Sequence, residues 1–145
     1  MEFRKYDRTY YVRIDKGEEI VSSLLELCRL EKIGSAVYSG IGGCNKAEIQ
    51  TFSPETGAFE TRELSGMLEL VAFNGNIICD DDGELYHHTH AVFAFNNNGV
   101  HGTAGGHIRS VTVLYTAEIE LRPVIGGVIR RKPDPETGTG FWELG

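Results

Sequence analysis

From residue 36 onwards, short segments with strand-like alternation are separated by turn signals rich in glycine, asparagine and aspartate. The chain has eighteen glycines but only four prolines, a balance that suits tight turns and bulges between strands. One segment, before residue 36, has helical periodicity. The sequence therefore predicts an α+β domain, with one main helix packed on a large, mostly antiparallel β-sheet of six to eight strands.

The predicted helix follows a break at Lys16 and Gly17. Apolar side chains then recur at the spacing of one helix face, at Ile20, Val21, Leu24, Leu25 and Cys28. Glu18 and Glu19 stand at its start, where the helix dipole favours acidic groups. Gly34 is expected to end the helix as a left-handed cap.

The predicted strands either alternate between apolar and polar residues or are rich in β-branched residues. They cover residues 9–15, 36–41, 47–52, 59–64, 66–72, 84–95 and 108–121. Hairpin turns are expected at 53–57 and at 96–99, where Asn98 and Gly99 form a strong turn signal. Asn74 and Gly75 are expected to form a turn or an irregularity.

The chain has 145 residues, the usual length of one domain with its own core. We expect a single domain over residues 1–145, with a body over about 1–128 and a C-terminal tail over about 129–145. Phe141, Trp142 and Leu144 are apolar, so this tail is expected to dock on the body.

Several features favour a cytoplasmic protein without a membrane partner. No run approaches the ~18 apolar residues of a membrane span, and the first residues are charged where a signal peptide is apolar. Cys28, Cys44 and Cys79 are odd in number and widely spaced, so no disulfide framework is expected. The sequence predicts localisation in the reducing cytoplasm.

The formal net charge of −7 bears on nucleic-acid binding. Proteins that hold DNA by its phosphates need a cationic surface, and the field of an acidic chain opposes that contact. Residues 129–133 contain three basic side chains, but acidic residues follow at once. We interpret this stretch as a solvated end of the domain, with a DNA contact as the alternative.

The histidines cluster between residues 87 and 107. His88 and His90 share one face of a predicted strand, because side chains alternate with period two. His107 begins the next long strand, and three imidazoles converge if the two strands lie near each other. Three neutral histidines suit Zn²⁺ or another divalent transition metal and leave one coordination position open.

Other interpretations of these histidines stay open. The His-x-His spacing also fits exposed histidines, or side chains hydrogen-bonded in a subunit interface. His87, on the opposite face, and His101 are interpreted as solvent or packing residues. The glycine-rich residues 102–106 do not form a phosphate loop, because they lack its lysine and lead into a strand.

The sequence resembles a known family, the PPC domain (plants and prokaryotes conserved). The motifs are Leu85-Tyr86-His87-His88-Thr89-His90-Ala91-Val92, Gly105-Gly106-His107-Ile108 and Thr116-Ala117-Glu118-Ile119. Gly66-Met67-Leu68-Glu69-Leu70 resembles its central strand, and residues 134–144 resemble its closing Asp-x-x-Thr-Gly segment. The resemblance extends over nearly the whole chain.

The resemblance implies an α+β fold assembled as a homotrimer, with His88, His90 and His107 as metal ligands near the subunit boundary. It also implies a stand-alone prokaryotic member, because the AT-hooks that plant members carry, with their Arg-Gly-Arg core, do not occur here. The family also has a DNA-binding label. Without the AT-hook, the resemblance implies the family's trimerisation module but not the segment with which plant members contact DNA.

Glu69 and Glu118 are the carboxylates considered for a role beside a metal. Glu69 alternates with Met67, Val71 and Phe73, which places it on an apolar, inward face. Either carboxylate could orient a ligand histidine or serve as a general base. The alternative is an ion pair with an arginine, for which the candidates are Arg62, Arg109 and Arg122.

Three functional hypotheses follow. The first is a homotrimeric metal-binding module that acts in regulation or scaffolding. The second is a DNA-binding, transcription-associated regulator. The third is a metal-dependent, hydrolase-like enzyme at the three-histidine site. The sequence leaves enzymatic activity open but favours a non-enzymatic role, because no convincing acid–base pair or nucleophile motif is present.

Overall fold

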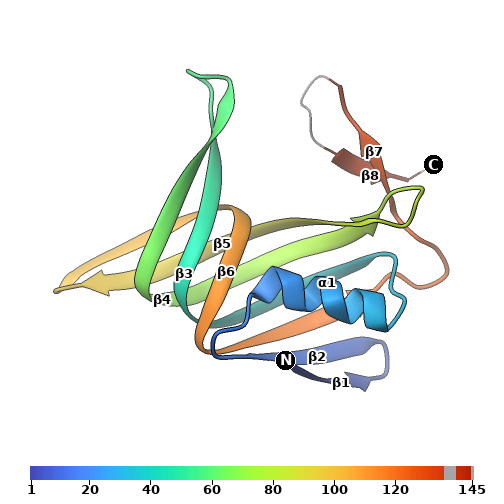
Figure 1. Cartoon of the computed structure of the whole chain (residues 1–145), viewed down its shortest axis with the longest axis horizontal. Helices are drawn as coiled ribbons and strands as arrows, with labels where there is room; N and C mark the ends of the chain where they lie inside the picture. The colour runs from blue at the N-terminus through green and yellow to red at the C-terminus, as the bar shows by residue number, and fades with distance from the viewer. Residues whose placement is uncertain (136–139, 145) are drawn as a thin grey trace.

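A computed structural model of the chain describes residues 1–135 and 140–144. This part of the chain contains one α-helix and eight strands (Figure 1). In chain order they are β1 (Glu2–Tyr6), β2 (Thr9–Asp15), α1 (Ile20–Leu30), β3 (Ala36–Ser53), β4 (Ala58–Cys79), β5 (Leu85–Asn97), β6 (Val100–Pro123), β7 (Arg130–Pro133) and β8 (Gly140–Glu143). The predicted α+β class is confirmed.

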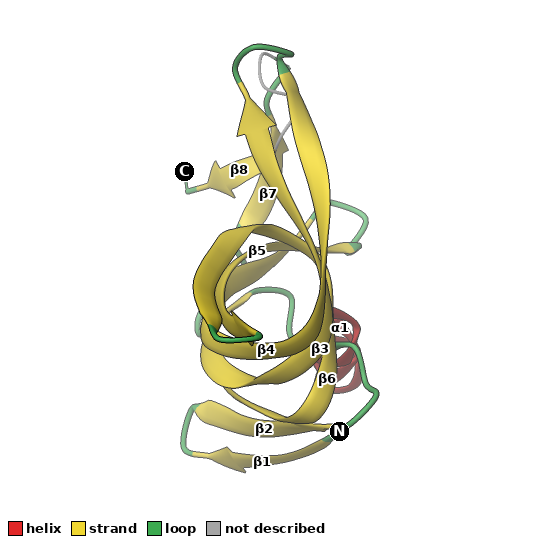
Figure 2. Ribbon diagram, turned by 90° about the vertical axis from the view of Figure 1, so that its left-hand side faces the viewer, coloured by secondary structure: helices red, strands yellow, loops and turns green. Residues whose placement is uncertain are grey.

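All eight strands belong to one sheet, and its pairings are antiparallel apart from a parallel bridge between β4 and β7. Strands β3, β4, β5 and β6 pair in a closed circuit, because β3 and β5 each pair with both β4 and β6. Figure 2 shows these strands curving around a common centre. β2 pairs with β6 and β1 with β2, so these two strands extend the sheet on one side.

Helix α1 lies against the sheet over β6 and β5 and closes the core (Figure 1). Its buried face includes Ile20, Leu24 and Leu27. These residues belong to one cluster with fully buried strand side chains such as Phe73 and Phe93. The core therefore lies between the helix and one face of the curved sheet.

The helix begins where the acidic residues predict but ends earlier than expected. The Glu19 carboxylate caps it by accepting hydrogen bonds from the N–H groups of Val21 and Ser22. The expected left-handed cap at Gly34 is wrong: Lys32 takes that conformation, with a φ of 55°. The N–H of Ile33 donates to the Cys28 carbonyl, and that of Lys32 to the Arg29 carbonyl, so a Schellman motif ends the helix before Gly34.

The strand predicted at residues 9–15 is β2, whereas four other predicted strands are parts of two longer ones. Residues 36–41 and 47–52 both lie in β3, and residues 59–64 and 66–72 both lie in β4. The β3–β4 register shifts between Gly40 and Gly42 and between Cys44 and Lys46. Each irregularity resets the alternation of faces, so one bulged strand has the sequence pattern of two. The sequence analysis also missed β1, which pairs with the predicted strand at 9–15.

The two expected hairpin turns, at 53–57 and 96–99, are present, but the turn expected at Asn74 and Gly75 is not. Asn98 and Gly99, with φ values of 51° and 86°, join β5 to β6 as expected. Asn74 and Gly75 instead lie inside β4. The Tyr38 side chain crosses Gly75 so closely that a Cβ there would stand 2.5 Å from the tyrosine oxygen. Close packing, and not a chain reversal, therefore requires the glycine.

The C-terminal hairpin β7–β8 contacts the body through Arg130, Arg131 and Trp142. Arg130 pairs with Cys79 of β4, and the Trp142 indole N–H donates to Oδ1 of Asn76. Phe141, Trp142 and Leu144 remain 52%, 44% and 75% exposed. Thr137 and Gly138 of the expected closing segment lie outside the described residues.

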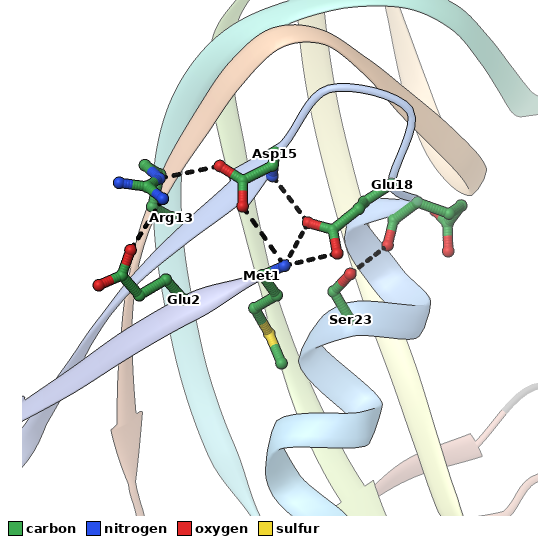
Figure 3. Close-up of polar contacts among 7 residues, drawn as sticks. Met1, Glu2, Arg13, Asp15, Glu18 and Ser23 are labelled. Atoms are coloured by element: carbon green, nitrogen blue, oxygen red, sulfur yellow. Dashed lines mark hydrogen bonds and ion pairs between the residues drawn. The ribbon is translucent and has the colours of Figure 1, made fainter.

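The N-terminal ammonium group joins β1 to the loop before α1 (Figure 3). Both carboxylate oxygens of Glu18 accept hydrogen bonds from the Met1 nitrogen at 2.5 Å, and Asp15 lies 3.6 Å from it. Arg13 pairs with Asp15 and Glu2 on the outer side of this cluster.

Helix α1 has 11 residues, and a membrane span needs about 20. The described part of the chain therefore has no helix that could cross a bilayer.

Candidate metal centre

Three of the predicted site residues lie together. His88 and His90 lie on β5 and His107 on β6, and His90 and His107 are direct partners in the β5–β6 register. One ring nitrogen from each of the three lies within 4.8 Å of the others. The ring centroids are 4.2 Å apart for His90 and His107, and 5.1 Å apart for each pair that includes His88.

The glycines before His107 allow this convergence. Strand β6 leaves β5 at His90 and joins β3 at Gln50, so three strands crowd together around His107. A Cβ at Gly105 would stand 2.5 Å from the Ala91 carbonyl oxygen, and one at Gly106 would stand 2.6 Å from that of Gln50. Residues without side chains therefore let the strands approach closely enough to place His107 opposite His90.

The environment favours the neutral form of two of the imidazoles, those of His88 and His107. The pKa of His88 is lowered mainly by partial burial and further by the nearby His90. The pKa of His107 is lowered by partial burial and then by His90 and His88. Neutral imidazole is the form that binds a metal, so the cluster has ligands ready at neutral pH.

The donor nitrogens of His90 and His107 lie close to the spacing that a tetrahedral metal ion requires. Nε2 of His90 lies 2.9 Å from Nδ1 of His107, a hydrogen-bond distance. Two imidazole nitrogens on one tetrahedral Zn²⁺ stand about 3.3 Å apart, given Zn–N bonds of about 2.0–2.1 Å. Moving these two nitrogens apart by a few tenths of an ångström would give them the spacing of zinc ligands. The His88 nitrogen, within 4.8 Å of both, would complete the set by a side-chain rotation.

A polar chain beside the cluster was missed by the sequence analysis. Nδ1 of His87 lies 2.9 Å from Oγ1 of Thr89, which also hydrogen-bonds the Tyr38 hydroxyl. Thr89 and Tyr38 are buried, and burial lowers the pKa of His87. His87 was interpreted as a solvent or packing residue, but it forms the more exposed end of this series of hydrogen-bonded side chains. Its position two residues before Thr89 on one strand face was the available signal.

The two predicted carboxylates do not join the histidines within the chain. The expectation that Glu69 points inward is wrong: the residue is exposed, because Leu68 and Leu70 occupy the inward face and a bulge after Leu70 lets Phe73 return to it. Glu118 is also exposed. Both line a cavity of about 530 Å³ to which none of the histidines contributes.

The alternative ion pairs for these carboxylates are not formed either. Within residues 1–135 and 140–144, neither Glu69 nor Glu118 has a cationic group within 4.0 Å. Arg109, one of the expected partners, pairs with Glu48 instead. Neither carboxylate has a partner that would fix its orientation.

Comparison with models of known protein families finds a match over most of the chain. The model of the Plants and Prokaryotes Conserved (PCC) domain, the family also abbreviated PPC, matches residues 1–125. The chain belongs to this family. The membership predicted from the histidine and glycine motifs is thereby confirmed. No curated protein matches this PCC-domain protein at a significant level.

Solved structures resemble this PCC-domain protein over almost its whole length. A plant- and prokaryote-conserved (PPC) protein from Pyrococcus horikoshii is 32% identical, with coverage of 99% and 95% of the two chains and a TM-score of 0.82. A metal-containing protein from Archaeoglobus fulgidus is 26% identical, with coverage of 99% and 97% and a TM-score of 0.81.

A third structure comes from Bacteroides thetaiotaomicron, and that protein is provisionally named as DNA-binding. It is 23% identical, with coverage of 98% and 96% and a TM-score of 0.87. At this identity the likeness shows the shared fold alone.

Proposed function

We propose that this PCC-domain protein is a homotrimeric metal-binding module with a regulatory or scaffolding role in the cytoplasm. The proposal depends on one observation, the convergence of donor nitrogens from His88, His90 and His107 within 4.8 Å. It is supported by the likeness to the metal-containing Archaeoglobus fulgidus protein. Zn²⁺ is the preferred ion, because three imidazoles and an open position suit it. The proposal treats residues 1–145 as one domain, with a body over about 1–128 and a tail over about 129–145.

Exposed apolar side chains support the proposed self-assembly. Ile41, Val71 and Tyr115 are 58%, 54% and 66% exposed, and they line the same cavity as Glu69 and Glu118. Grouped apolar surface of this kind is typical of protein interfaces. We assign it to the subunit contact, where a neighbouring chain would also determine what the two carboxylates touch.

Metal analysis of protein purified without a histidine tag tests the proposal. Replacement of His88, His90 or His107 by alanine is expected to abolish most zinc binding. His101→Ala is the matched control, since His101 is an exposed histidine on β6 outside the cluster. Less than about one-tenth equivalent of metal per wild-type chain would contradict the metal site. A monomeric mass in solution would contradict the trimer.

DNA binding is the alternative that the name of the Bacteroides protein suggests. The basic stretch gives it little support: Arg130 lies 3.5 Å from Asp81, and Arg131 covers the ring of Tyr86. Mobility-shift titrations at rising salt test DNA binding. Phosphate contacts would give binding with a steep salt dependence, and no binding even at low ionic strength would contradict this function.

The hydrolase-like alternative has no carboxylate base beside the histidines in the described part of the chain. Among the described residues, no carboxylate lines the cavity beside His88 and His107. It therefore ranks below the binding functions.

A further inference from the structure

A cavity of about 860 Å³ opens beside the histidine cluster. Its walls include Phe52 and Phe59 from the β3–β4 hairpin, Tyr86 and His88 from β5, His107 from β6 and Arg131 from β7. Phe59 and His107 are in edge contact, with ring centroids 5.1 Å apart, so the aromatic wall is continuous with the proposed metal site. The volume is within the range of small-molecule sites.

The cavity forms where two paired strands separate. β5 pairs with β6 only from His90 onwards, and β6 turns to β3 at His107. The part of β5 before His90 therefore has a partner in β4 but none in β6. The C-terminal hairpin supplies Arg131 and Phe141 on the open side of this separation.

The charge of the cavity differs from that of the whole chain. The protein has 21 acidic residues, yet no aspartate or glutamate is among the described lining residues. The ionisable residues there are Arg131, Tyr86 and the histidines at 87, 88 and 107. An otherwise acidic molecule thus presents a cavity whose described lining has a fixed positive group and no carboxylate.

Arg131 is held in place by an aromatic ring and has no acidic partner among residues 1–135 and 140–144. Its guanidinium carbon lies 4.8 Å from the centre of the Tyr86 ring. The Tyr86 hydroxyl in turn donates to Oδ2 of Asp80, which fixes the ring. None of the ion pairs formed by the described residues involves Arg131. A positioned guanidinium of this kind binds a carboxylate by two parallel hydrogen bonds.

We infer that this cavity binds a small organic carboxylate with an aromatic or other apolar body. The carboxylate would lie towards Arg131 and the histidine cluster, and the apolar body against Phe52 and Phe59. This inference deepens the proposed function and rests on it for the second positive charge, which the metal would supply. The recognition by Arg131 and the aromatic wall belongs to the chain itself.

Benzoate is the test probe, and the neutral benzamide, of similar shape, is its comparison. Titrations of the zinc-loaded full chain, followed by protein-detected NMR, are expected to shift amide signals near Tyr86, His107 and Arg131. Benzamide is expected to bind at least about tenfold more weakly, because it lacks the charge that the guanidinium recognises. Arg131→Gln is expected to weaken benzoate by about tenfold, and Arg122→Gln, an exposed arginine outside the cavity, to leave it unchanged.

The possible results separate this inference from the metal proposal, since zinc binding is titrated independently. Zinc binding without benzoate binding would overturn the cavity inference and leave the metal site intact. Equal affinity for benzoate and benzamide, or equal affinity of the two arginine variants, would also overturn it. Arg131-dependent benzoate binding without zinc binding would support the cavity and contradict the metal site.

Discussion

His90 and His107 face each other across the β5–β6 ladder, with Nε2 of His90 2.9 Å from Nδ1 of His107. One of the two rings must donate the proton of this hydrogen bond, so the neutral pair adopts complementary tautomers. The same two nitrogens are the ones proposed to bind the metal. Metal binding would therefore replace this hydrogen bond between β5 and β6 with coordination bonds from the same two strands.

Zinc is expected to stabilise the folded protein, because it binds ligands that only the folded sheet brings together. At a free zinc concentration of 100 times the Kd, the free energy of unfolding should rise by about 2.7 kcal/mol. Thermal unfolding with zinc and with a chelator measures this difference. His101→Ala should retain the zinc effect and His90→Ala should lose it; an identical zinc effect in both variants would contradict the site.

Gly75→Ala is expected to destabilise the fold by about 1–3 kcal/mol or more, the usual cost of overpacking. The added Cβ would stand 2.5 Å from the Tyr38 oxygen and 2.6 Å from the His88 carbonyl oxygen. Gly127→Ala is the matched control, since a Cβ at Gly127 meets nothing within 4 Å. Urea unfolding of both variants measures the effect, and equal stability would show that Tyr38 can move aside at little cost.

Glu19→Ala is expected to lower the free energy of unfolding by about 2–3 kcal/mol. The Glu19 carboxylate caps α1 and also accepts a hydrogen bond from the Val111 N–H of β6 at 2.9 Å. Its loss leaves the helix end and a strand amide without their acceptor. Glu26→Ala, at an exposed helix position, should change stability by less than about 0.5 kcal/mol. Chemical denaturation compares the two variants, and a cost as small for Glu19 as for Glu26 would contradict the double role.

The pair of Met1 and Glu18 is expected to stabilise the fold most strongly between pH 4.5 and 8.0. The hydrogen bond from the N-terminal ammonium lowers the Glu18 pKa below its usual 4.5, so this stabilisation is lost as the pH falls through the lowered pKa. The bond to Glu18 raises the ammonium pKa above its usual 8.0, so the stabilisation is also lost as the pH rises through the raised pKa.

Glu18→Gln tests this pH window in protein that retains Met1. The Glu18 side chain is 36% exposed, so solvent screening should keep the loss below about 1 kcal/mol near neutral pH. Melting temperatures of the variant and the wild type should converge at both ends of the pH range. A difference that does not vary with pH would show that the charge of Glu18 is not responsible.

Local signals in the sequence predicted the helix, both tight hairpins and the histidine triad. The triad could be predicted because the two-residue period of a strand places His88 and His90 on one face. The glycines before His107 indicated only that the chain there is unusual. Their actual role, the close approach of β6 to the backbones at Ala91 and Gln50, depends on strand neighbours that no local pattern specifies.

The errors in the predicted fold arise from a bulge, from a distant packing contact and from a local helix end. The alternation around Glu69 was extrapolated across the bulge after Leu70, which changes the face of every later residue. Gly75 had the composition of a turn, but Tyr38, which is distant in sequence, is the reason for it. Gly34 was a reasonable helix cap, but the hydrogen bonds of Lys32 and Ile33 ended the helix first.

The pairing of β3 with β6 joins Ala36 to Pro123 and therefore spans most of the chain. A ribosome must synthesise nearly the whole polypeptide before this central ladder can form. Until β5 and β6 are synthesised, the hairpin of β3 and β4 has unpaired backbone groups along its edges, where strands of other nascent chains could pair. Because such distant partners must meet by loop closure, we expect folding on the millisecond-to-second timescale, with completion only after the last long strand has emerged.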